Sequence, residues 1–162
     1  MGSHAICPGS FDPVTNGHLD IIRRAASLFE KVTVVVTENP MKHPAFSVEQ
    51  RIDFIRRITK SVPNVSVDSH CGLLAEYTKS HEVTAIVKGL RAVSDFEYEL
   101  QQATFNHKFD PGVDTVFLTA RAEYMGLSSS AVKQIAYFGG EISDLVPGEI
   151  LEDVKAGLGL MK

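Results

Sequence analysis

The sequence predicts an α/β fold in which five parallel strands form a doubly wound sheet with helices on both faces. Short apolar or β-branched runs alternate with segments whose apolar residues recur at helical spacing, and no linker, repeat or low-complexity tract interrupts them. Strict alternation favours parallel strands joined by right-handed crossovers. The 162 residues, 44% of them hydrophobic, suit one domain with one core. We therefore expect a single Rossmann-like domain spanning residues 1–162.

The first half of the chain is predicted to alternate three strands with three helices. A Pro-Gly pair ends the first strand, and the second, β-branched throughout, is expected to be buried on both faces. Ser47 and Gln50 have the spacing of a capping box, which predicts a helix extending to Thr59. In chain order, the predicted elements are residues 5–7, 17–29, 32–36, 47–59, 65–67 and 73–80.

The second half continues the same alternation. Ser94 and Glu97 have the spacing of a second capping box. Gly139-Gly140 is expected to end the helix predicted at residues 129–137. Pro147 is a suitable first residue for a C-terminal helix within residues 147–162. The predicted elements are residues 83–87, 94–107, 113–118, 129–137 and this last helix.

Composition excludes several classes of protein. Sixteen Lys and Arg against twenty Asp and Glu give a net charge of −4, which argues against binding nucleic acid or an anionic membrane through bulk positive charge. No apolar run is long enough to span a membrane, and no secretion signal is apparent, so a soluble cytoplasmic protein is expected. The acidic segment 141–153 predicts a solvated helix face or a subunit contact. Residues 1–4 partly resemble a cloning scar and receive no functional weight.

The cysteines and histidines show no metal-site spacing. Cys7 lies in an apolar stretch and is expected to be a small core residue, and Cys71 forms no close pair with it. His70, His81 and His107 lack the spacing of zinc ligands, so we predict no protein-held metal.

The loop after the first strand, residues 8–18 (PGSFDPVTNGH), is the strongest candidate site. In parallel sheets ligands collect beyond the carboxyl ends of the strands. His18 falls in the first turn of a helix, where a neutral imidazole can donate a hydrogen bond to a phosphate oxygen. A capping or core histidine is the alternative interpretation. The loop is neither a Walker A loop nor a Gly-x-Gly-x-x-Gly dinucleotide fingerprint.

Three cations and a serine run follow other strands. Lys42, Lys88 and Arg91 are each expected near the carboxyl edge, where together they would suit a ligand with several phosphates. Taken singly, each is more simply a solvated surface charge. The serines 128–130 at a helix start offer an anion site or an N-cap, and both roles are compatible. Ser130 and Lys133 also match Ser-x-x-Lys, but the companion acylation motifs are absent, so that function is rejected.

These motifs resemble those of a known enzyme family. Residues 15–18 (TNGH) resemble the Thr/His-x-Gly-His motif of the nucleotidyltransferase superfamily, and residues 8–18 are similar to those of bacterial phosphopantetheine adenylyltransferases in particular. The resemblance extends from residue 5 to about residue 146. The further strings that carry it are MKHP at 41–44, VKGLR at 87–91, DFEYE at 95–99 and LSSS at 127–130.

The resemblance implies an activity and a set of site residues. It implies adenylyl transfer from ATP to 4′-phosphopantetheine, giving dephospho-coenzyme A, with Mg²⁺ carried by ATP, coenzyme A as a plausible feedback ligand and a homohexameric assembly. His18 and Lys42 would be catalytic. Ser10, Lys42, Leu74 and Lys88 would bind phosphopantetheine. ATP would be bound by Ser10, Phe11, His18, Gly89, Leu90, Arg91, Glu99, Tyr124, Met125, Gly126, Leu127, Ser128, Ser129 and Ser130. The alternatives are another small-molecule nucleotidyltransferase of this fold and a non-catalytic nucleotide-binding module.

Two positions depart from the pattern of these enzymes. Lys88 stands where arginine is common, which replaces a bidentate phosphate contact by a point charge. Residues 124–127 (YMGL) replace a bulkier stretch, and Gly126 is expected to loosen the loop beside the nucleotide.

Overall fold

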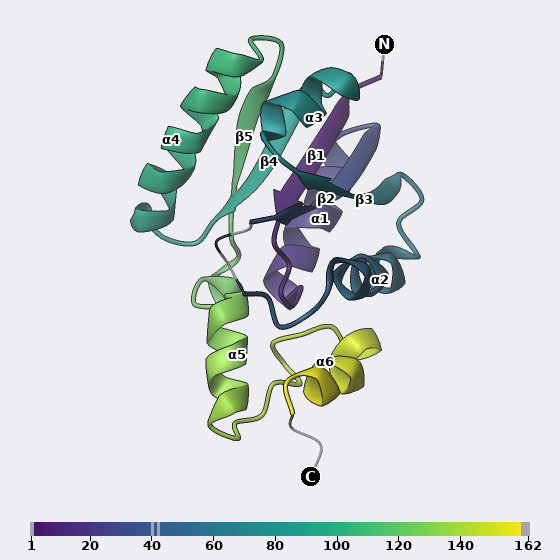
Figure 1. The fold of residues 1–162 in the computed structure, drawn as a ribbon, viewed down its shortest axis with the longest axis vertical. Coiled ribbons are helices and arrows are strands. Elements are labelled where there is room, and N and C mark those ends of the chain that lie inside the picture. The colour runs from purple at the N-terminus through teal and green to yellow at the C-terminus, as the bar shows by residue number, and fades with distance from the viewer. Residues whose placement is uncertain (1, 40, 42, 160–162) are drawn as a thin grey trace.

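The predicted fold is confirmed by the computed structural model, which describes residues 2–39, 41 and 43–159. Five parallel strands form one sheet in the order β3-β2-β1-β4-β5 (Figure 1). Neighbours of β1 lie on both sides of it, so the chain changes direction of winding there. The strands are β1 (His4–Gly9), β2 (Lys31–Glu38), β3 (Val65–Cys71), β4 (Ala85–Leu90) and β5 (Asp114–Thr119).

Helices cover both faces of the sheet. One core cluster joins alternate residues of the central strands to α1 (Asn16–Leu28) and α2 (Val48–Thr59). A second, smaller cluster holds the opposite face against α3 (Leu74–Ser80), and α4 (Val93–Phe109) stands beside β4 and β5. In Figure 1, α5 (Ser129–Tyr137) and α6 (Leu151–Gly157) lie beyond the end of the sheet toward which β1 points. The carboxyl edge of the sheet is therefore enclosed by segments distant in sequence.

The two predicted capping boxes have different outcomes. Ser47 and Gln50 form theirs: each side chain accepts a hydrogen bond from the other residue's backbone N–H. The box at Ser94–Glu97 is wrong, because α4 begins at Val93 with Ala92 as an N-cap that makes no side-chain bond. The Asp95 carboxylate instead accepts hydrogen bonds from the backbone and guanidinium of Arg91.

Several element boundaries also differ from those predicted. The Pro8-Gly9 pair does not end the first strand, because β1 continues through Gly9, and β3 continues to Cys71. β4 extends to Leu90 because its pairing with β5 continues to Leu90↔Thr119, so Lys88 and Gly89 lie within the strand rather than after it. Pro147 begins a single 3-10 turn, Gly148–Ile150, and the last α-helix starts only at Leu151.

Polar and charged residues near both ends of the chain make contacts within the fold. His4 is buried in β1, where its Nε2 lies 2.9 Å from the Thr33 hydroxyl. Residues 1–4, which received no functional weight from the sequence, therefore include one residue that packs within the fold. In the acidic segment, Glu141 pairs with Lys155 and Asp153 pairs with Arg57 of α2. Among the described residues, no helix is both long and apolar enough to cross a lipid bilayer.

Candidate functional site

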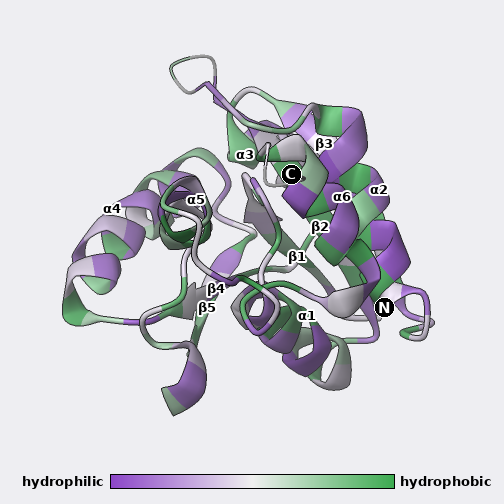
Figure 2. Ribbon diagram, turned by 90° about the horizontal axis from the view of Figure 1, so that it is seen from below, coloured by the Kyte–Doolittle hydropathy of each residue, from purple (hydrophilic) through white to green (hydrophobic). Residues whose placement is uncertain are grey.

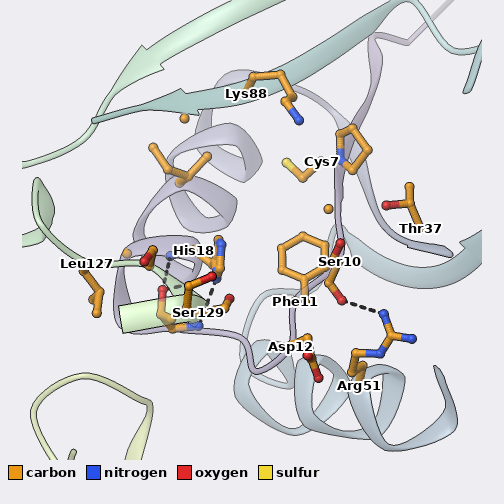
Figure 3. A pocket seen from close by; sticks show the side chains of 18 of the residues that line it. Cys7, Ser10, Phe11, Asp12, His18, Thr37, Arg51, Lys88, Leu127 and Ser129 are labelled. Atoms are coloured by element: carbon orange, nitrogen blue, oxygen red, sulfur yellow. Dashed lines mark hydrogen bonds between the residues drawn. The ribbon is translucent and has the colours of Figure 1, made fainter. Parts of the chain in front are cut away.

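A cavity of about 700 Å³ opens at the carboxyl edge of the sheet (Figure 3). Its walls come from the loop after β1, the end of β4, the segment after β5 and the start of α5. Strand order explains this meeting, since β1 and β4 are neighbours and their carboxyl ends share one edge. The predicted site residues that line it are Ser10, Phe11, His18, Lys88, Gly89, Arg91, Glu99, Tyr124, Leu127, Ser128, Ser129 and Ser130.

His18 both caps α1 and faces this cavity. Thr15 is the N-cap, and its hydroxyl accepts from the His18 backbone N–H at 3.3 Å. In return the Thr15 backbone N–H donates to His18 Nδ1 at 3.0 Å, so the histidine fills the place usually taken by Glu or Gln in a capping box. Nδ1 must therefore be unprotonated, which leaves the proton of a neutral imidazole on Nε2. The capping interpretation of His18 is confirmed, and donation to a phosphate oxygen stays a prediction.

The surroundings of His18 keep it uncharged. Burial, together with the smaller effects of the nearby positive charges of Arg91 and Lys88, lowers its pKa to about 4. At neutral pH the imidazole therefore presents a neutral Nε2–H donor. This agrees with the expectation of a neutral histidine at a helix start.

Phe11 supports the His18 ring from one side. Its φ of 51° turns the side chain inward, where the ring is buried and lies edge-to-face with His18 at a centroid distance of 5.1 Å. A Cβ on Gly9 would approach this ring to 3.1 Å, which explains the glycine at the end of β1. Phe11 lines the cavity but is only 5% exposed, so little of its ring is available to a ligand.

Each cation near β4 is paired with an acid of α4. Lys88 Nζ lies 3.2 Å from Glu99 Oε2, and Arg91 Nε lies 3.1 Å from Asp95 Oδ2. Arg91 also donates to the Leu127 carbonyl at 2.8 Å, which joins the end of β4 to the segment before α5. Glu99, expected to bind ATP, therefore borders the cavity as the partner of a lysine.

Gly89 has a packing role that the sequence did not reveal. A Cβ there would lie 3.0 Å from Cγ1 of Ile21 on α1. The glycine is therefore needed for the close approach of α1 to β4. The resemblance had implied a different role for Gly89, in binding ATP.

The serine run begins α5 and also anchors the first loop. Ser128 is the N-cap of α5 and accepts from the Ala131 N–H, which confirms the capping role. The Ser129 hydroxyl donates to the Pro13 carbonyl at 2.8 Å, so its proton is engaged within the protein. Leu90, Met125 and Gly126 do not line the cavity, and Met125 is 55% exposed.

A second cavity of about 580 Å³ adjoins the first. The two share lining residues, among them Lys88, Glu99 and Cys71. Leu74 lines only the second cavity, together with Leu73, Phe105 and Phe109. Lys42 lies outside the described residues. Cys7 is confirmed as a buried thiol, and burial raises its pKa to about 12.

Four charged residues that line the first cavity were not predicted as site residues: Asp12, Glu38, Arg51 and Lys133. Asp12 is paired with Lys133 at 2.7 Å, and Arg51, 3% exposed, donates to the Ser10 carbonyl at 2.8 Å. Burial raises the pKa of Asp12, but hydrogen bonds from Lys133, Ala45 and Phe46 outweigh it and the pKa is lowered. One sequence signal was available, since Lys133 follows Ser129 by one helical turn and so shares its face.

The sequence matches one known protein family over most of its length. The model described as "Cytidylyltransferase-like" matches residues 6–135. The matched region includes every element from β1 through most of α5, and with them both cavities' walls. The matched residues are far more than half of the 162-residue chain, so the chain belongs to the cytidylyltransferase-like family.

Proposed function

We propose that the protein transfers the adenylyl group of ATP to 4′-phosphopantetheine, giving dephospho-coenzyme A and pyrophosphate. Family membership supports nucleotidyl transfer in general. The observation that carries the choice of acceptor is the junction of the two cavities at Lys88. One cavity is bordered by cations and helix starts, which suit phosphates, and the other has an apolar wall.

The second cavity suits the long arm of phosphopantetheine. Leu73, Leu74 and Phe105 offer apolar surface for its methylene and dimethyl groups. Gln102 and Asn106 of α4 offer side-chain amides that can hydrogen-bond the two amide groups of the arm. The phosphate end would then lie at Lys88, facing the first cavity.

The chemistry that this arrangement supports is direct in-line transfer. An oxygen of the acceptor phosphate forms a bond to the α-phosphorus of ATP while the bond from that phosphorus to the bridging oxygen breaks, and pyrophosphate leaves with the electron pair. His18 Nε2–H stabilises a non-bridging oxygen as negative charge spreads. Arg91 and the free amides at the start of α5 neutralise the remaining phosphates. Lys42 is proposed to hold the acceptor phosphate.

No protein nucleophile is needed for this reaction. The Cys7 thiol lines the cavity, but its pKa of about 12 keeps it protonated and therefore a poor nucleophile. Positioning and charge stabilisation are then what the chain contributes.

We further propose that Mg²⁺ enters with ATP as part of the substrate. Within residues 2–39, 41 and 43–159, no three His, Cys, Asp or Glu side chains gather as a metal site. Asp12 and Glu99, two carboxylates at the first cavity, are each held by a lysine. The residues described do not fit a resident ion, so the nucleotide phosphates and water would hold it.

The homohexamer stays a proposal, and the surface of α4 supports self-association. No residue of this 17-residue helix is buried, although hydrophobic residues alternate with hydrophilic ones along its ribbon (Figure 2). Its exposed apolar residues include Val93 at 79% and Leu100 at 46% exposure. Exposed apolar surface of this kind is typical of a protein–protein contact. Light scattering after size-exclusion chromatography should give six times the 17.7 kDa chain mass.

A pyrophosphate-release assay with paired substrates tests the proposal. ATP or CTP is combined with phosphopantetheine, glycerol 3-phosphate or nicotinamide mononucleotide, and each substrate is also tested alone. Release should require ATP and phosphopantetheine together. Release with another pair would favour a different nucleotidyltransferase of this fold, and no release with any pair would favour a non-catalytic module.

A matched pair of variants tests the second cavity as the acceptor site. Leu74→Ala removes about three methylene groups of contact at roughly 0.8 kcal/mol each. The KM for phosphopantetheine should therefore rise about 10-fold or more, with the Kd for ATP unchanged. Leu28→Ala, at a residue that lines neither cavity, is the control. An unchanged KM in Leu74→Ala would remove this cavity from the acceptor site.

A further inference from the structure

Two consecutive residues of the first loop, Asp12 and Pro13, are bonded to side chains of α5. Lys133 Nζ lies 2.7 Å from Asp12 Oδ2, and the Ser129 hydroxyl donates to the Pro13 carbonyl at 2.8 Å. Ser129 and Lys133 are one turn apart and so lie on the same face of the helix. This face of α5 is therefore bound to the loop between β1 and α1.

Asp12 extends this connection to a third segment. Its carboxylate, 8% exposed, also accepts from the backbone N–H groups of Ala45 and Phe46 at 3.0 and 2.9 Å. These residues lie just before α2. One buried carboxylate thus joins the first loop, the approach to α2 and α5, and both Asp12 and Lys133 line the first cavity.

The position of Asp12 determines the position of the ring that supports His18. Phe11 immediately precedes Asp12, and its ring contacts the His18 ring edge-to-face. On the far side of Phe11, the buried Arg51 guanidinium fixes the Ser10 carbonyl (Figure 3). Phe11 is therefore held by Arg51 on one side and, through Asp12, by Lys133 on the other.

We propose that Lys133 is a positioning residue for nucleotidyl transfer, acting through Asp12 and Phe11 on the orientation of His18. The inference rests on the proposed function for its kinetic consequence. Lys133 does not itself need to touch a substrate. A misplacement of a reacting group by about 1 Å can cost on the order of 100-fold in rate.

The test compares Lys133→Met with Lys133→Arg and Lys155→Met. Lys155 is the matched control, because its ion pair with Glu141 at 3.3 Å lies outside both cavities. In Lys133→Met, kcat should fall about 10- to 100-fold while the Kd for ATP stays within about 3-fold. Lys133→Arg should recover most of the loss, since it restores a cation at Asp12, and Lys155→Met should match the wild type.

A double variant separates positioning from direct binding. Lys133→Met leaves the buried Asp12 carboxylate without its ammonium partner, which can prevent folding. Asp12→Asn/Lys133→Met removes that carboxylate as well, so the double variant replaces Lys133→Met if the single variant fails to fold. Because Lys133 acts through Asp12, the double variant should be no slower than the slower of the two single variants. Multiplying losses in kcat, or an ATP affinity lost with Lys133 but kept in Asp12→Asn, would overturn the proposal in favour of a direct contact.

The His18 imidazole signals in NMR spectra give a readout that needs no substrate. They should shift in Lys133→Met and remain in place in Lys155→Met. Unchanged kcat together with unchanged His18 signals would overturn the positioning role. A wild type that does not use phosphopantetheine, combined with the expected His18 shift, would refute the proposed substrate and leave the positioning role supported.

Discussion

His18 has two separable roles, and a pair of substitutions distinguishes them. Nδ1 accepts the Thr15 N–H at 3.0 Å and completes the cap of α1, while Nε2–H is the donor proposed for the reacting phosphate. His18→Asn keeps an acceptor near the place of Nδ1 but ends short of Nε2. His18→Ala removes both groups.

The expected magnitudes of the two roles differ. Loss of a cap bond costs about 1 kcal/mol of stability. Loss of one donor to developing negative charge costs about 2.7–4 kcal/mol of transition-state stabilisation, or 10²- to 10³-fold in kcat. His18→Ala should therefore lose both stability and rate, and His18→Asn should lose the rate alone.

Urea unfolding and pyrophosphate release measure the two effects on the same preparations. The free energy of unfolding of His18→Asn should lie close to that of the wild type, with the rate loss of His18→Ala. If His18→Asn turns over within a few-fold of the wild type, Nε2 is not the donor to the reacting phosphate. If His18→Ala is as stable as the wild type, the bond from the Thr15 N–H to Nδ1 does not contribute to stability.

Three further results are expected. Gly89→Ala should lower the free energy of unfolding by about 1–3 kcal/mol through its clash with Ile21, as measured by thermal unfolding. The double variant with Ile21→Ala should lose less stability than the two single variants combined, and a purely additive result would contradict the packing role. Because the pKa of His18 is about 4, well below the ordinary 6.5, kcat should not report its protonation between pH 8 and 5 and should fall as pH approaches 4. The unfolded chain takes up this proton near pH 6.5, so the free energy of unfolding should decrease as pH falls from about 6.5 to 4; a His18 titration near 6.5 by NMR would contradict both statements. Lys42→Ala should raise the KM for phosphopantetheine and lower kcat, and unchanged values of both would remove Lys42 from the site.

The fold was predictable because its signals are local and repeated. The β-branched run at residues 32–36 forms the buried centre of β2, and Ser47 with Gln50 begins α2 as a capping box should. The motif at 94–97 has the same spacing yet fails, because α4 already begins at Val93 and Ser94 lies inside the helix. A local pattern cannot show at which residue a helix begins.

The site was predictable only where topology places residues at a strand end. His18 and Arg91 follow β1 and β4, and these neighbours bring them to one cavity. Asp12 and Lys133 are separated by 121 residues, and their pairing depends on how α5 packs against the first loop. Gly89 of β4 packs against Ile21 of α1, a contact between segments distant in sequence. Contacts of this kind arise from tertiary packing, which spacing along the chain does not encode.

Identification of the product by mass spectrometry tests the central claim most directly. The wild type is incubated with ATP, Mg²⁺ and 4′-phosphopantetheine, with His18→Asn as a folded control. The account predicts dephospho-coenzyme A and pyrophosphate in equal amounts from the wild type, with formation reduced 10²- to 10³-fold in the variant. Absence of dephospho-coenzyme A from a folded wild type, or equal formation by His18→Asn, would contradict it.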